Sequence, residues 1–271
     1  MRVSQFFTAG AVSILVASSA SAQIITQWNF NSGADASAAT GTTAPSIDLV
    51  TGTPSLGLVG GTTNPSFNSG VGSSDPEATD DSGWQITTWA AQGVENLQRG
   101  IQINVNTTGF ENITFSFDQR HSNSVSRYFG VQYTTDGTNY ITLPGSLLTP
   151  GTVVSSGTAD TATVVGNLFS GDGGDVFFNG RGGNLAGISG VNNNPNFAIR
   201  ILSSFDPTTG NSYTVSDNDP AISAYATTGT ARFDMITVNG TAAVVVPEAN
   251  TLGLLALALP IIGGVIARRR K

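Results

Sequence analysis

The apolar run near the end of the chain places the tightest limit on folding. A segment that crosses a bilayer must satisfy its backbone polar groups internally, so this run can only be a helix there. It extends from Thr251 to Ala267, roughly 17 residues, which is the lower limit for a membrane-spanning helix. Cations directly after such a helix favour the cytoplasmic face. We therefore predict one transmembrane helix with a basic tail at 251–271, whose membrane stop is Arg268, Arg269, Arg270 and Lys271.

The residues before this run carry a resemblance to a sorting signal. A linker at 241–250 contains Val246, Pro247, Glu248 and Ala249. With the short apolar run and the terminal Arg cluster, this segment resembles the PEP-CTERM signal of bacteria that make extracellular polysaccharide, although Ala249 replaces the second Pro of that motif. The resemblance implies that an exosortase-type membrane protease detaches the body, which then passes to the cell surface or matrix. The alternative is a one-pass anchor that is never cut.

The first residues have the layout of a secretory signal peptide at 1–22. Arg2 precedes an apolar stretch from Phe6 to Ala17, and small residues end it at Ala20-Ser21-Ala22. Cleavage there would make Gln23 the first residue of the mature chain. We expect the body to lie outside the cytoplasm and the basic tail inside.

The body, 23–240, is expected to be all-β. It is rich in Gly, Thr, Ser, Asn and Val and has no long amphipathic helical pattern. This length and the number of strand signals favour a two-sheet antiparallel sandwich of jelly-roll or Greek-key type, in which the first and last strands are neighbours. Strands are predicted at 24–30, 47–50, 56–59, 84–89, 101–105, 112–118, 127–134, 139–143, 162–165, 197–203, 222–226 and 231–238.

Three local patterns within the body are more specific. Ile113, Phe115 and Phe117 alternate and should face the core together. The dipeptide Asp136-Gly137 predicts a tight hairpin turn. The glycine-rich stretch Gly166–Gly190 suggests a mobile surface loop.

Charge and composition exclude several functions. Without Arg2 and the basic tail, six Arg oppose eighteen carboxylates, a formal charge of about −12, so nucleic acid is not expected as a partner. The absence of Cys excludes thiol catalysis, and a single His, His121, excludes a multi-histidine metal centre. His121 is expected in a loop. A hydrolase would need paired carboxylates, for which Glu95, Glu111 and Asp118 are candidates.

Calcium is the one ion that the composition suggests, because it takes oxygen ligands and the body is rich in Asp and Asn. Jelly-roll carbohydrate-binding modules, which the predicted body resembles, hold a structural ion near an Asp of the final strand, and this resemblance implies Asp234 first. Asp217 and Asp219 are further candidates, as is Asp172-Gly173-Gly174-Asp175. The alternative is that these residues only form turns.

Two functional classes follow. The first is a non-catalytic, exported surface or matrix protein that binds carbohydrate, with Trp84, Trp89, Tyr128 and Tyr140 as candidate rings for stacking on sugars. The second is a secreted polysaccharide hydrolase.

Overall fold

The computed structural model describes residues 21–32, 40–50, 52–76, 80–154, 160–217 and 223–243. The expected signal peptide up to residue 20, the sorting motif, the apolar run and the basic tail lie outside these ranges, and so does Asp219. Within them, no helix has the length and apolar character needed to cross a membrane. The one helical turn of these ranges is a 3-10 turn at Gly145–Leu147, and strands form the remaining regular structure.

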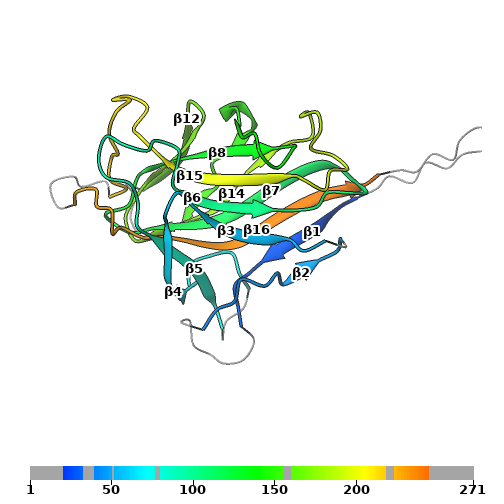
Figure 1. Cartoon of the computed structure of the whole chain (residues 1–271). Coiled ribbons are helices and arrows are strands. Elements are labelled where there is room, and N and C mark those ends of the chain that lie inside the picture. Colours follow the sequence, from blue (N-terminus) through cyan, green and yellow to red (C-terminus); the bar gives the residue numbers. More distant parts are fainter. Residues whose placement is uncertain are drawn as a thin grey trace, which may run out of the picture.

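The strands form two antiparallel sheets that make a β-sandwich (Figure 1). The nine-stranded sheet contains β1 (Ala22–Trp28), β2 (Ile47–Asp48), β4 (Thr63–Ser69), β5 (Ser82–Thr87), β7 (Phe110–His121), β10 (Leu148–Thr149), β11 (Thr152–Val154), β14 (Val176–Asn184) and β16 (Ala231–Ala242). The seven-stranded sheet contains β3 (Ser55–Val59), β6 (Gly100–Asn104), β8 (Tyr128–Thr134), β9 (Ile141–Thr142), β12 (Thr161–Val165), β13 (Leu168–Asp172) and β15 (Ala198–Ser204).

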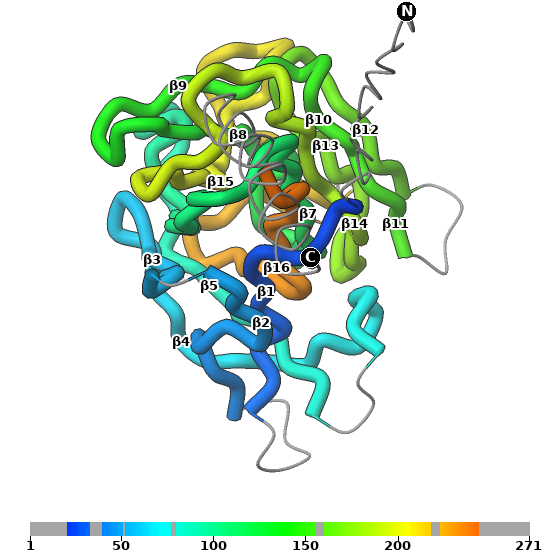
Figure 2. Tube along the Cα trace, turned by 90° about the vertical axis from the view of Figure 1, so that its right-hand side faces the viewer, coloured from blue at the N-terminus to red at the C-terminus, as the bar shows by residue number. Residues whose placement is uncertain are grey.

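The two ends of the described chain lie together. The main path of the nine-stranded sheet is β10-β14-β7-β16-β1-β2, so the first strand pairs with the last, as expected. Ala22 is opposite Thr241, and Gln23 is opposite Gly240. The start of β1 and the end of β16 therefore meet at one end of the sandwich, on the right in Figure 1 and facing the viewer in Figure 2.

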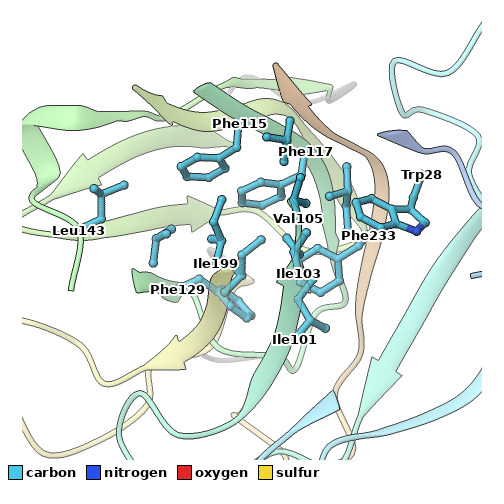
Figure 3. Packing of buried hydrophobic residues seen from close by; sticks show 14 of the residues in the cluster. Trp28, Ile101, Ile103, Val105, Phe115, Phe117, Phe129, Leu143, Ile199 and Phe233 are labelled. Carbon is cyan, nitrogen blue, oxygen red and sulfur yellow. The ribbon is translucent and has the colours of Figure 1, made fainter. Parts of the chain in front are cut away.

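The core fills the space between the sheets (Figure 3). Ile113, Phe115 and Phe117 of β7 are all buried there, which confirms the predicted inward face. From the other sheet, Phe129 and Ile199 contribute to the same cluster. Such burial of aromatic and branched side chains supplies the main stabilisation in a chain without cysteine.

The prediction of a mobile loop at Gly166–Gly190 is wrong. This stretch contains all of β13 and β14, which pair with β8 and β7. Glycine in this stretch allows neighbouring strands to approach closely, since a Cβ at Gly182 would lie only 2.2 Å from the Phe115 carbonyl oxygen. Strand β4 was not expected, and the described residues 223–226 form no strand. The predicted hairpin is present, since β8 pairs with β9, but the connection from Thr135 to Tyr140 is longer than the tight Asp136-Gly137 turn that was expected.

Candidate functional site

The last strand changes its neighbour at Asp234. On one edge, β16 pairs with β5 up to Phe233, opposite Trp84, and with β1 from Ile236 onward, opposite Trp28. The register shifts between Asp234 and Thr237, and Met235 has a φ of 47°. A bulge of this kind re-aims side chains. On this edge, Asp234 therefore lies between the end of the pairing with β5 and the start of the pairing with β1. On the other edge, it lies opposite Asp118 of β7.

Three carboxylates meet at this position. Asp75 and Asp81 come from the connection between β4 and β5, and Asp234 comes from β16. One oxygen of each lies within 4.8 Å of the others. Asp234 is fully buried, on the face opposite the core residue Phe233, while Asp75 and Asp81 are partly exposed. The outer face of the nine-stranded sheet thus carries an acidic triad, by which we mean Asp75, Asp81 and Asp234.

Neighbouring groups hold the triad in place. Asn31, just after β1, donates its amide to Asp75 Oδ2 at 2.9 Å and accepts the Ser82 N–H at 2.9 Å. Gly70 has no side chain where the carboxylates converge: a Cβ there would lie 1.9 Å from Asp81 Oδ1 and 2.7 Å from Asp234 Oδ2. Carboxylate oxygens therefore occupy the space that a side chain at position 70 would fill.

The electrostatics of Asp234 are unusual. Its Oδ1 accepts the Met235 N–H at 2.7 Å, but its Oδ2 is buried and accepts no hydrogen bond from any described residue. Burial raises the pKa of Asp234 to about 8, with Asp75 and Asp81 acting in the same direction, against the Ser73 hydroxyl and the Met235 N–H. The fold thus favours either a proton or a cation at this carboxylate.

A loop of the β4–β5 connection covers this part of the sheet. Asp118 lies opposite Asp234 on β7 and accepts the N–H groups of Ser74, at 2.5 Å, and Gly180, at 2.7 Å. Asn179 of β14 donates its amide to the Gly72 carbonyl at 2.9 Å. The segment Gly70–Ser74 is therefore fixed over β7, β14 and β16, next to the triad.

The other carboxylates that were candidates for calcium lie elsewhere or outside the described residues. Asp217 is not in the triad, and its Oδ2 accepts the Ser223 hydroxyl at 2.7 Å. Asp172 and Asp175 form ion pairs with Arg127, at 2.7 Å, and Arg120, at 3.0 Å. Sequence reasoning missed Asp75 and Asp81. The signal that could have indicated them is the concentration of acidic residues in this stretch, with Asp75, Glu77, Asp80 and Asp81 within seven positions.

Three of the four aromatic residues expected to stack on sugars lie inside the protein. Trp84, Trp89 and Tyr128 are all buried, so none offers a ring face to a ligand. Trp84 stacks on Phe30 with centroids 5.9 Å apart, and the Trp89 indole donates to the Gly229 carbonyl at 2.8 Å. These rings therefore contribute to core packing. Tyr140, by contrast, is only partly buried.

Tyr140 belongs to a polar row on the outer face of the seven-stranded sheet. In register across the sheet are Gly57, Gln102, Arg200 and Gln132. The chain neighbours of Gln102 and Arg200 are buried in the core, so these two side chains point outward. Arg200 donates through Nε to Gln102 Oε1 at 2.8 Å, and its guanidinium carbon lies 3.4 Å from the centre of the Tyr140 ring. These five residues form what we call the polar row.

The carboxylates proposed for a hydrolase are not paired with one another along β7. Glu111 and Asp118 are seven residues apart on one strand, or about 23 Å at about 3.3 Å per residue. Glycosidase carboxylates lie about 5–9.5 Å apart. Glu95 forms an ion pair with Arg99, which lowers its pKa.

His121 is buried, not in a loop as expected. It ends β7 and faces the core, where Nδ1 lies 2.7 Å from Ser216 Oγ and Nε2 lies 3.0 Å from Arg181 Nη1. Arg181 is itself fully buried and hydrogen-bonds Gln119 Oε1. The Ser216 hydroxyl also lies 2.8 Å from the Gly171 and Gly173 carbonyl oxygens. Burial and the nearby Arg181 charge place the pKa of His121 well below its usual value, so we interpret this as a structural network.

Comparison of the chain with protein-family models, with curated proteins and with solved structures gives no match in any of the three.

Proposed function

We propose that the chain is an exported, non-catalytic surface or matrix protein, sorted through its PEP-CTERM-like tail, which binds extracellular polysaccharide. The observation that carries this proposal is the pairing of β1 with β16, which places Ala22 opposite Thr241. The expected signal-peptide cut follows Ala22, and the linker to the sorting motif begins at residue 241. Both processing events would then occur at one end of the sandwich.

This arrangement suits a body that is released from a membrane. A sandwich tethered at one end keeps the outer faces of its sheets accessible before and after cleavage. The strand orders β1-β16-β7-β14 and β6-β15-β8-β13, with the chain crossing between sheets, support a jelly roll. Lectin domains are among the jelly rolls, but a fold alone does not define an activity.

The polar row is the surface that we propose for sugar binding. Amide groups of Gln102 and Gln132 can both donate to and accept from sugar hydroxyls, and the Arg200 guanidinium can donate. The half-buried Tyr140 ring, already packed on Arg200, adds an apolar surface beside them. Gly57 has no side chain, and no atom lies within 4 Å of where a Cβ would be, so a flat polysaccharide chain could approach the sheet there.

The test is binding of the exported, processed protein to a glycan array, with an assay for reducing ends. Arg200→Ala and Tyr140→Ala should each weaken binding about tenfold, or about 1.4 kcal/mol. Arg120→Ala, on the opposite sheet, is the matched control and should bind normally. Binding that survives both polar-row changes would contradict this surface, and reducing-end release by the purified protein would favour the hydrolase.

A further inference from the structure

We propose that the acidic triad binds one calcium ion, which joins the last strand to the connection between β4 and β5. This site is independent of the sugar-binding proposal, because it lies on the other sheet and uses no residue of the polar row. The ligands are one carboxylate oxygen each from Asp75, Asp81 and Asp234.

The spread of the oxygens matches the size of this ion. Calcium binds oxygen at about 2.3–2.6 Å, so two ligands of one ion lie at most about 4.6–5.2 Å apart. The three oxygens lie within 4.8 Å of one another. The triad can therefore surround a calcium ion with little movement, and calcium also accepts the irregular geometry that carboxylates from three separate segments provide.

The buried oxygen of Asp234 gives the independent reason for a ligand. A buried carboxylate is costly unless a counter-charge or hydrogen bonds compensate it. Asp234 Oδ2 accepts no hydrogen bond from a described residue, and none of the ion pairs among the described residues includes Asp234. Arg232, two residues earlier, donates instead to the Ser69 carbonyl and to Gln85 Oε1. The Arg232 charge attracts Asp234 and Asp81 but forms no ion pair with Asp234, and a cation between the carboxylates supplies closer compensation.

The site is also preorganised by residues that are not ligands. Gly70 leaves the carboxylate oxygens room to converge, and Asn31 holds Asp75 through a hydrogen bond to Oδ2. The ion would tie together three segments that are distant in the sequence: the chain after β1, the β4–β5 connection and the bulge of β16. Asp118, directly across from Asp234, has both oxygens occupied by backbone N–H groups and is left out of the ligand set.

The test uses calcium chloride as the probe on the full chain, purified in mild detergent and stripped with EDTA. Isothermal titration at pH 8 should show one calcium per chain, with a Kd of about 0.1 mM or tighter, and calcium should raise the melting temperature. Asp234→Asn and Asp81→Asn should weaken binding at least tenfold. Asp48→Asn, which removes an equal charge on β2, should bind like the wild type.

Hydrogen exchange on the unmodified protein provides a measurement that needs no variant. Calcium should slow exchange in peptides that cover Gly70–Asp81 and Ala231–Val238, and it should leave the hairpin peptide Thr134–Leu143 unchanged. The proposal is overturned if the wild type takes up no calcium, if protection appears only elsewhere, or if Asp234→Asn and Asp81→Asn bind as tightly as the wild type.

Discussion

Asp118 and Asp234 stand directly opposite each other on β7 and β16, yet their carboxylates are compensated in different ways. Asp118 accepts two backbone N–H groups, one on each oxygen. Asp234 accepts the Met235 N–H on Oδ1, and the Ser73 hydroxyl also favours its charged form, but Asp75 and Asp81 lie beside it and oppose that charge. Like charges on opposite residues of a strand pair are destabilising. The Asp118 charge is therefore compensated by backbone N–H groups, one of them from the covering loop, whereas the Asp234 carboxylate favours a proton or a cation.

The first prediction concerns the pH dependence of stability without calcium. Because the pKa of Asp234 is raised from 3.8 to about 8, the folded protein holds a proton that the unfolded chain releases. This contribution is full below pH 4 and is lost as the pH rises toward 8, a loss on the order of several kcal/mol. In EDTA, the melting temperature should therefore fall from pH 5 to pH 8.

Asp234→Asn is the variant that isolates this effect. An amide does not ionise, so the variant should lose most of the fall between pH 5 and pH 8, as followed by circular dichroism. A wild-type melting temperature that stays constant over this interval in EDTA would contradict the assignment of a buried, protonated Asp234.

The second prediction compares two glycines. A Cβ at Gly70 would overlap Asp81 Oδ1 at 1.9 Å and crowd Asp234 Oδ2 at 2.7 Å, whereas a Cβ at Gly57 would meet nothing within 4 Å. Neither residue has a positive φ, so the difference is steric. Gly70→Ala should cost about 2 kcal/mol in the free energy of unfolding and impair calcium binding, and Gly57→Ala should change stability by less than about 1 kcal/mol. Urea denaturation of both variants checks this, and equal midpoints would refute it.

The third prediction uses the single histidine of the chain. Burial, and next the charge of Arg181, lower the pKa of His121 well below 6.5, against a hydrogen bond with the Gly171 backbone. The imidazole should therefore stay neutral, and its one NMR signal should not titrate between pH 5 and 8. With only one His in the sequence, the signal needs no assignment.

Removing the neighbouring charge gives the matching variant. Arg181→Met should raise the pKa of His121, although burial should still hold it below its ordinary value. Arg200→Met, on the outer face of the other sheet, should leave the His121 signal unchanged. A wild-type imidazole that titrates near 6.5 would place His121 in solvent and disagree with the buried network.

The sequence allowed the fold to be predicted better than the site. Period-two alternation located β6 and β7 and the inward face of Ile113, Phe115 and Phe117, because alternation follows directly from strand geometry. It failed at β13 and β14, where glycines allow strands to approach closely and resemble a loop in composition. Trp84 and Trp89 were assigned a binding role that depended on exposure, which alternation alone cannot reveal.

The site required tertiary information. Asp234 could be singled out from the last strand, but its neighbours depend on β16 changing partner from β5 to β1. That exchange brings the β4–β5 connection to Asp234 across a long stretch of chain. No spacing rule links Asp75 or Asp81 to residue 234, so the sequence alone could not indicate which carboxylates lie beside Asp234.

The central claim is that an exported sandwich is cut at both of its adjacent ends. Its most direct test is intact-mass and terminal-peptide spectrometry of the protein recovered from the surface and medium of the cells that make it. We predict a chain that begins at Gln23 and ends within or next to Val246–Ala249. A recovered chain that still begins at Met1 and ends at Lys271 would contradict the account.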